Sequence, residues 1–141
     1  MRLQHHIEIA APADRVWLFT YDVEGLPDLT PTMTSVEILG PRPLSPGCQV
    51  RVKQPAQRAK IWTVAELEHN RRLAWTTKGT GITMTASHDV QAGVDKTLNT
   101  LTVEIEGPLA AILGPLIRRP ILRALATENA GIKAAAETAA E

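Results

Sequence analysis

His88 is the residue in this sequence best suited to acid–base chemistry. It lies in the segment 82–90, where Ile82 and Met84 alternate with polar residues as in a half-buried strand. Because alternate residues of a strand share a face, His88 is predicted to point inward with Met84. An imidazole titrates near about pH 6.5 and burial shifts it readily, so His88 could act as a general acid or base. A buried histidine that only bonds Asn99 or a backbone carbonyl is the alternative.

A second histidine, His5, is predicted to face the same interior. Residues 3–9 alternate apolar and polar side chains, so His5 and His88 could hold a ligand between them. His6 then points to the opposite face, and the adjacent pair cannot chelate one metal ion from a straight strand. With one cysteine, Cys48, no His-x-x-x-His spacing and no carboxylate cluster, we expect no metal site. The sequence also lacks a nucleophile motif, a phosphate-binding glycine loop and a dinucleotide fingerprint, so no cofactor is expected.

Other side chains are predicted to line this interior as apolar walls or as polar groups that orient a ligand. A hydroxyl or an amide on an apolar wall can position a polyphenol or a polyketide, although such groups can equally serve the fold. Tryptophans supply flat apolar walls and can equally be plain core. The candidate catalytic residue is His88, and the candidate ligand-binding residues are His5, Tyr21, Trp75, Met84, Asn99, Leu101 and Leu125.

Antiparallel strands are predicted to carry most of these residues, since no long helix separates one strand from the next. The turn centred on Asn70 places Leu67 opposite Leu73. This regular pairing leaves Trp62 and Val64 on the outer face of the sheet.

A second two-residue turn is predicted at Thr80-Gly81. It places the apolar side chains that follow on the same face as Trp75. Matching the apolar faces of the last two strands then brings Met84 opposite Val103 and His88 near Asn99.

Helices are predicted near both ends of the chain. Two short helices follow Pro12, because the apolar pattern stops around 21–22 and again around 25–27. Within residues 107–141, prolines 115 and 120 are expected to break or kink the first part, so the long helix begins near 119. Its buried face is predicted to contain Ile121, Leu125, Asn129 or Glu128, Ile132 and Ala136.

Composition restricts the class of protein. The 141 residues are predicted to form one domain, 1–141, and 44% of them are apolar. Lys plus Arg and Asp plus Glu each number 15 and are dispersed, which argues against binding to nucleic acid. The start lacks the apolar run of a secretory signal, and the apolar stretch 108–117 is too short to span a membrane. We therefore expect a cytoplasmic protein without integral membrane association, of undetermined oligomeric state.

The apolar segment 109–113 could form a lid, a membrane-touching tip or the core-facing start of the last helix.

The order of elements, a strand, two short helices, six strands and a long helix, has a counterpart in a known superfamily. Residues that carry the likeness are 9–17 (Ile-Ala-Ala-Pro-Ala-Asp-Arg-Val-Trp), Tyr21-Asp22, Pro31 before Val36-Glu37, Gly47, 62–66 (Trp-Thr-Val-Ala-Glu), Trp75, His88 and Gly107-Pro108-Leu109. The sequence thereby resembles the START-like or Bet v 1-like superfamily, most closely its bacterial polyketide cyclase/dehydrase branch. Relatives often carry a tryptophan before the proline of Leu29-Thr30-Pro31, so a pocket entrance that is wider or less aromatic is expected here.

The resemblance implies an α+β helix-grip fold, in which a curved antiparallel sheet of about seven strands wraps around the long C-terminal helix. It also implies an internal cavity that binds a hydrophobic or aromatic small molecule. Chemistry of the cyclase or dehydratase type would then operate chiefly by folding a flexible substrate. The alternatives are a non-catalytic carrier or sensor of lipid, quinone or isoprenoid, and a regulator that docks on another protein through the exposed sheet face.

Overall fold

Seven strands and one long helix dominate the computed structural model of the chain, which describes residues 1–139. In chain order the elements are β1 (Arg2–Ile9), α1 (Ala13–Tyr21), a 3-10 turn η1 (Val23–Gly25), α2 (Leu26–Leu29), β2 (Ser35–Leu39), β3 (Gln49–Lys53), β4 (Lys60–Glu68), β5 (Arg72–Gly79), β6 (Ile82–Ala92), β7 (Thr97–Glu106) and α3 (Ala110–Thr138). The strands form a sheet in the order β1-β7-β6-β5-β4-β3-β2, and all neighbours pair antiparallel. The predicted α+β helix-grip fold is confirmed.

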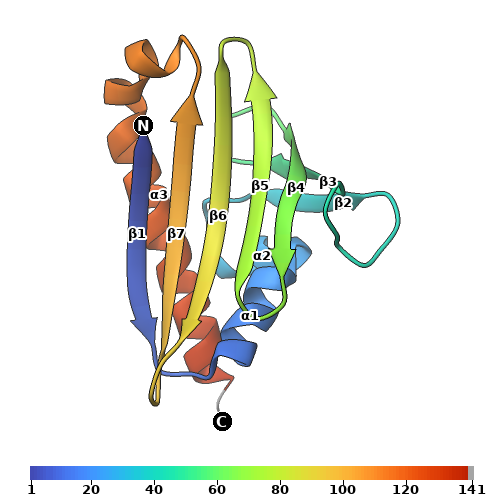
Figure 1. Cartoon of the computed structure of the whole chain (residues 1–141), viewed down its shortest axis with the longest axis vertical. Coiled ribbons are helices and arrows are strands. Elements are labelled where there is room, and N and C mark those ends of the chain that lie inside the picture. Colours follow the sequence, from blue (N-terminus) through green and yellow to red (C-terminus); the bar gives the residue numbers. More distant parts are fainter. Residues whose placement is uncertain (140–141) are drawn as a thin grey trace.

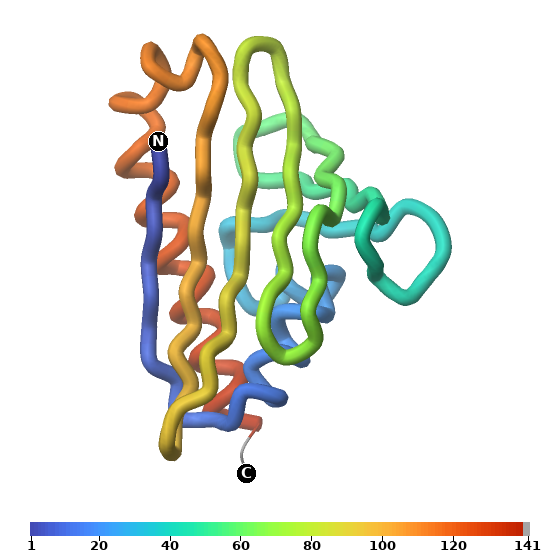
Figure 2. Tube along the Cα trace, in the orientation of Figure 1, coloured from blue at the N-terminus to red at the C-terminus, as the bar shows by residue number. Residues whose placement is uncertain are grey.

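The helices all lie on one side of the curved sheet (Figure 1). α3 runs diagonally behind β1 and β7, and its C-terminal part approaches α1 (Figure 2). α1 and α2 lie behind the strands of the other half of the sheet. The sheet and α3 can therefore enclose a space between them, since a twisted sheet curves around the helix that it covers.

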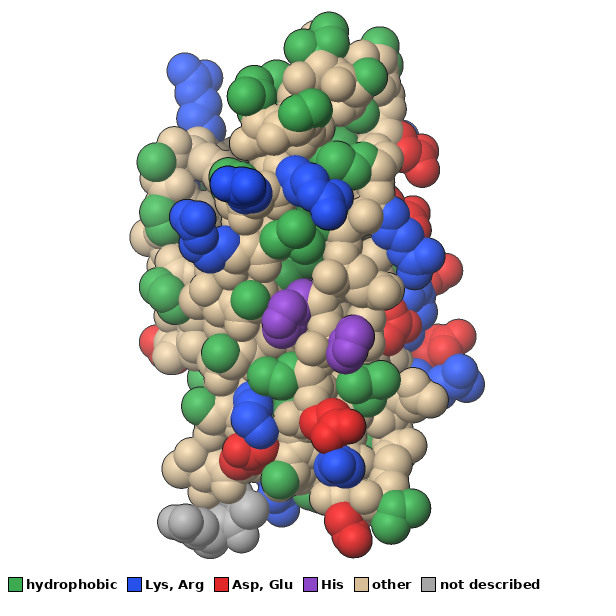
Figure 3. Space-filling view, turned by 90° about the vertical axis from the view of Figure 1, so that its left-hand side faces the viewer, with side chains coloured by type: hydrophobic (Ala, Val, Ile, Leu, Met, Phe, Trp, Pro, Cys, Tyr) green, Lys and Arg blue, Asp and Glu red, His purple; other side chains and the backbone are tan. Residues whose placement is uncertain are grey.

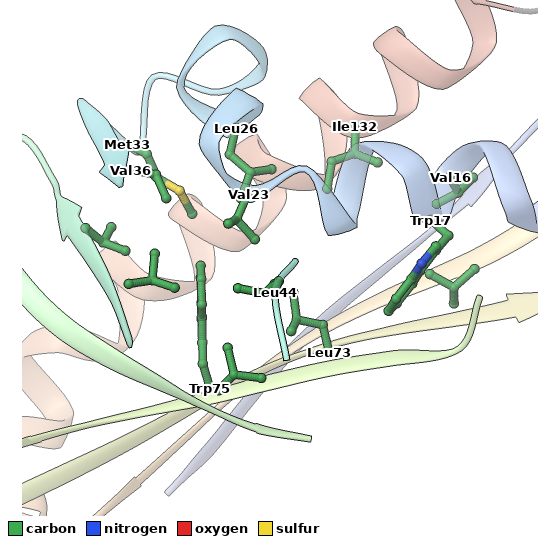
Figure 4. Packing of buried hydrophobic residues seen from close by; sticks show 14 of the residues in the cluster. Val16, Trp17, Val23, Leu26, Met33, Val36, Leu44, Leu73, Trp75 and Ile132 are labelled. Atoms are coloured by element: carbon green, nitrogen blue, oxygen red, sulfur yellow. The ribbon is translucent and has the colours of Figure 1, made fainter. Parts of the chain in front are cut away.

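The core forms where side chains of the three helices meet the sheet (Figure 4). Trp17 of α1 and Leu26 of α2 are fully buried on the helical side. Leu73 and Trp75, alternate residues of β5, face them from the sheet, and Ile132 of α3 belongs to the same cluster. The predicted inward direction of Trp75 is confirmed, because the helix period and the strand period place these apolar residues on facing surfaces.

The predicted orientation of the first half of β4 is wrong. Trp62 and Val64 are only 8% and 1% exposed, whereas the prediction placed both on the outer face. Leu67 does pair with Leu73 as predicted, but Val64 pairs with Trp75, and a bulge shifts the register between Val64 and Glu66. A bulge adds one residue to one strand, so every side chain beyond it changes face.

The predicted register between β6 and β7 is wrong by two residues. Met84 pairs with Ile105 rather than Val103, and Asn99 pairs with Val90. His88 lies opposite Leu101. Because a shift of two residues preserves the alternation, the predicted inward face of both strands is nevertheless correct.

The helix α3 begins at Ala110 and continues through Pro115 and Pro120 without a break, so the predicted start of the long helix near residue 119 is wrong. Each proline leaves the carbonyl four residues earlier without a helical donor. Those carbonyls belong to Ala111 and Leu116, which are both exposed, so water can satisfy them. The predicted buried stripe of the helix is confirmed from Leu125 onward, with Leu125, Glu128, Asn129, Ile132 and Ala136 all buried, whereas Ile121 is half-buried.

Thr97→Val is expected to lower the free energy of unfolding by about 1–2 kcal/mol. The buried Thr97 hydroxyl donates to the carbonyl of Ala11 at 2.7 Å, and valine would leave that carbonyl without its donor. Thr100→Val, on the same strand, is the control, because the Thr100 hydroxyl makes no hydrogen bond within residues 1–139. Urea denaturation compares the variants. Equal midpoints for both would mean that this bond does not secure the connection between β1 and α1.

No helix within residues 1–139 is long and apolar enough to cross a membrane.

Candidate functional site

A cavity of about 400 Å³ lies between the sheet and α3. Pockets that bind small molecules have volumes of roughly 300–1,000 Å³, so this one can hold a compact ligand. Exposed residues at its opening are Gln57, Lys60 and Pro120. Its apolar wall consists of Met33, Val52, Trp62, Trp75, Ile82, Met84, Ala86, Leu101, Val103, Leu113, Ile117, Ile121, Ala124 and Leu125.

Two ionisable side chains face each other inside this apolar wall. His88 of β6 is 4% exposed and Glu128 of α3 is 7% exposed. The distance between His88 Nε2 and Glu128 Oε1 is 3.8 Å, which is too long for a hydrogen bond. His88 Nδ1 and Glu128 Oε1 are buried and have no hydrogen-bond partner in the part of the chain that the structure describes. Buried polar atoms without partners are uncommon in proteins, and two of the five such side-chain atoms in the described chain belong to residues that line this cavity.

Burial moves the two pKa values in opposite directions. It lowers the pKa of His88 to about 4, an effect that the charge of Asp89 partly opposes. It raises the pKa of Glu128 to about 7, because the carboxylate form loses its hydration inside the cavity. At neutral pH His88 is therefore neutral and can accept a proton, while a large fraction of Glu128 still carries one. A base and an acid thus stand side by side in an apolar space.

Packing fixes the orientation of the His88 ring. Trp75 meets it edge to face, with ring centroids 6.2 Å apart and an interplanar angle of 83°. Leu73 and Leu101 are its partners on the two neighbouring strands. Glu128 lies one helical turn beyond Leu125 and one turn before Ile132, both of which are buried. The two ionisable groups are thus held on packed elements of the fold rather than on loops.

Five of the predicted site residues line the cavity: Trp75, Met84, His88, Leu101 and Leu125. They come from four elements, and strand alternation and helical spacing bring them to one interior.

The other three predicted site residues, His5, Tyr21 and Asn99, are not among the residues that line this cavity. The Tyr21 hydroxyl donates to the carbonyl of Leu44 at 3.4 Å. Asn99 Nδ2 donates to Asn129 Oδ1 at 2.8 Å, and no hydrogen bond joins Asn99 to His88.

His5 and His88 occupy one row of the sheet, because both pair with Leu101. The strand β7 therefore separates them. Asn129 of α3 donates from Nδ2 to both Nδ1 and the carbonyl oxygen of His5, at 2.8 and 3.1 Å. The His5 ring is thereby engaged with α3, and its Nδ1 acts as the acceptor.

The sequence does not single out Glu128 as a site residue and places it only as an alternative to Asn129 on the buried face of the helix. An acidic residue three positions after Leu125 and four before Ile132 was the available signal. Its pairing with His88, forty residues earlier in the chain, depends on how α3 lies across the sheet.

No group of three or more His, Cys, Asp and Glu side chains within residues 1–139 is arranged to hold a metal ion.

Comparisons with known proteins identify a matching family and solved structures that share the fold. A family model described as "Polyketide cyclase / dehydrase and lipid transport" matches residues 1–137. A search of curated proteins found no match. Norcoclaurine synthase from Thalictrum flavum, a point mutant in complex with a transition state analogue, is 20% identical with a TM-score of 0.77, covering 100% of this chain and 96% of that one.

Two further solved structures are similar over most of their length. A START superfamily protein from Mycobacterium smegmatis is 19% identical with a TM-score of 0.72, covering 94% of this chain and 97% of that one. The Zhui aromatase/cyclase from Streptomyces sp. R1128 is 23% identical with a TM-score of 0.70, covering 99% and 93%. At these identities the likeness shows the shared fold.

Proposed function

The chain belongs to the polyketide cyclase/dehydrase and lipid transport family, as its sequence resemblance indicated, and from that premise we propose that its cavity binds a hydrophobic or aromatic small molecule. We further propose that His88 and Glu128 exchange protons with that molecule. The function that follows is that of a cyclase or dehydratase.

The observation that carries this proposal is the pair of buried ionisable groups without hydrogen-bond partners. Burying such groups is unfavourable in free energy, and a protein that only carries an apolar ligand does not need them. A ligand carbonyl or hydroxyl placed between the two would supply the missing partners. Perturbed acids and bases in a cavity are the usual sign of a reactive site.

The pair can carry out an aldol-type ring closure without any other group. Neutral His88 takes a proton from a carbon next to a carbonyl, and the resulting carbanion attacks a second carbonyl carbon of the same folded substrate. Glu128 in its acid form gives its proton to the oxygen of that second carbonyl, which becomes a hydroxyl. The proton then returns from His88 to Glu128 through the new hydroxyl of the product or a water molecule, since their atoms are 3.8 Å apart, and both groups are neutral again.

Enclosure of the substrate supplies the rest of the rate enhancement. Holding two reacting carbons together in one cavity can contribute about 7–11 kcal/mol to the barrier reduction. Loss of water from the new ring follows the same proton route. His88 takes a second carbon-bound proton, the C–O bond breaks, and Glu128 protonates the leaving hydroxide.

Filling the cavity tests whether it binds ligands. Ala124→Phe, in the lining of the cavity, is expected to weaken binding of the dye 1-anilinonaphthalene-8-sulfonate by about tenfold or more, because the ring occupies its space. Ala130→Phe is the matched control, since Ala130 is exposed on the same helix. Fluorescence titration gives the affinities, and a thermal melt checks that both variants fold. Equal affinities would argue that the dye binds elsewhere.

A non-catalytic carrier of lipid, quinone or isoprenoid is the alternative, favoured by the largely apolar wall. Native mass spectrometry can separate the two functions. If the protein is a dehydratase, the double variant His88→Gln, Glu128→Gln should retain a compound heavier by one water than the product found in the unmodified protein. Because ring closure alone leaves the mass unchanged, the retained compounds are also compared by chromatography, and the same compound in both proteins would support the carrier. A regulator that docks on another protein should retain no compound in either.

A further inference from the structure

The beginning of α3 forms an exposed apolar tip. Seven large apolar side chains within residues 1–139 are exposed, and three of them, Leu109, Ile112 and Leu116, lie at this place. Ile112 and Leu116 are 67% and 73% exposed. Met1, a fourth member of the seven, lies beside them, against Gly114. Figure 3 shows hydrophobic side chains gathered at this end of the molecule. A cluster of exposed apolar side chains is typical of an interaction site.

Positive charge follows the apolar tip along the same helix. Residues 107–127 contain three arginines, Arg118, Arg119 and Arg123, and no acidic residue. All three are exposed, and none takes part in an ion pair within the described chain. Lys and Arg side chains appear below the hydrophobic end in Figure 3. This charge stands out in a chain whose formal net charge is zero.

The spacing places the apolar and basic residues on one stripe. Leu109, Ile112, Leu116, Arg119 and Arg123 follow one another at steps of three and four, which keeps them on one face of a helix. With a rise of about 1.5 Å per residue, Arg119 and Arg123 lie about 5 and 10 Å along the axis from Leu116. Helices that lie in a membrane interface bury their apolar residues to about 5–10 Å, with cations at the headgroups. For a helix that meets the membrane by its end, distance along the axis is depth, so Leu116 would reach the apolar boundary while Arg119 and Arg123 stay at the headgroups.

A second stripe of the same helix faces the cavity. Leu113, Ile117, Ile121 and Ala124 alternate with the exposed stripe and line the cavity wall. Pro120, an exposed residue of the cavity lining, directly follows Arg119 in the sequence. One helix segment therefore presents an exposed apolar and basic surface on one side and the cavity wall on another.

We propose that the tip formed by Leu109, Ile112 and Leu116, with Arg118, Arg119 and Arg123, docks on the surface of an anionic lipid bilayer. The apolar side chains enter the interface, and the arginines contact lipid phosphates, which guanidinium groups bind in pairs of hydrogen bonds. A second copy of the chain fits this surface less well, because a twofold contact would bring the same three arginines of each copy together. The docking does not depend on whether the cavity is catalytic. It brings Pro120, an exposed residue of the cavity lining, near a source of hydrophobic molecules.

Vesicle sedimentation tests the proposal with the full chain. Unmodified protein should bind vesicles of phosphatidylcholine containing about 30% phosphatidylglycerol, and it should bind pure phosphatidylcholine at least about tenfold more weakly. Ile112→Ser with Leu116→Ser should reduce binding to the anionic vesicles by about tenfold or more. Replacing the three arginines by glutamine should reduce it similarly, and high salt should reproduce that loss.

Matched controls remove the same side-chain types elsewhere. Leu18→Ser with Val94→Ser removes two other exposed apolar residues and should leave binding within about twofold. Replacing Arg15, Arg51 and Arg71 by glutamine removes the same charge and should have a much smaller effect than the loss at the tip. Circular dichroism should show that all variants fold.

Two outcomes would overturn the proposal. One is failure of the unmodified protein to bind anionic vesicles, or binding that the tip substitutions leave unchanged. The other is a dimer, detected by light scattering without lipid, that Ile112→Ser with Leu116→Ser converts to a monomer, since the tip would then be a contact between copies.

Discussion

Gly131→Ala should lower the free energy of unfolding by about 3 kcal/mol, although alanine is the better helix former. Gly131 lies where α2 crosses α3, and a Cβ atom there would stand 2.1 Å from the carbonyl oxygen of Leu29 and 2.9 Å from its carbonyl carbon. Both are backbone atoms, so the helices must separate to make room. Thr32 and Met33, which follow α2, line the cavity, and we expect dye binding to weaken as well.

Gly114→Ala is the matched control in the same helix. A Cβ atom at Gly114 would meet only the flexible end of the Met1 side chain, at 3.2 Å from its sulfur. Helix propensity favours alanine there, whereas the following Pro115 disfavours a Cβ atom, so the free energy of unfolding should change by less than about 1 kcal/mol. Urea denaturation measures both variants. If Gly131→Ala proved as stable as Gly114→Ala, the close packing of α2 on α3 would be refuted.

The inward-facing residues of the sheet could be predicted because alternation allows only two orientations for each strand. The need to bury the apolar side chains selects one of them. His88 and Met84 share a face with Trp75, and the turns at Asn70 and Thr80-Gly81 fix which strands are neighbours. Local patterns were sufficient there, since each pair is joined by a short turn.

Features that depend on distant contacts could not be predicted. The bulge in β4 reverses Trp62 and Val64, and its presence follows from how the sheet curves around the helices. The register between β6 and β7 could not be determined from the sequence, because a shift by two residues keeps the same side chains on the apolar face. The proximity of Glu128 to His88 could not be predicted, because it depends on how α3 lies across the sheet. Nothing near either residue in the sequence indicates the other.

Removing one member of the His88–Glu128 pair should change how stability depends on pH. The pKa of Glu128 is raised from 4.5 to about 7, so its contribution is present at low pH and is lost as pH rises from 4.5 to 7. The pKa of His88 is lowered from 6.5 to about 4, so its contribution is present above pH 6.5 and is lost as pH falls to 4. Between pH 4.5 and 6.5 the two trends oppose each other.

Glu128→Gln should therefore become more stable relative to the unmodified protein as pH rises from 4.5 to 7, by about 3 kcal/mol, since each pKa unit is worth about 1.4 kcal/mol. His88→Gln should become less stable relative to the unmodified protein as pH rises from 4 to 6.5, by a similar amount, because the unmodified protein gains stability there. Urea denaturation of all three proteins across this range measures both differences, and contributions from other groups cancel in the comparison. Parallel pH profiles would show that neither group is buried in its neutral form, and the acid and base roles proposed for them would have no physical basis.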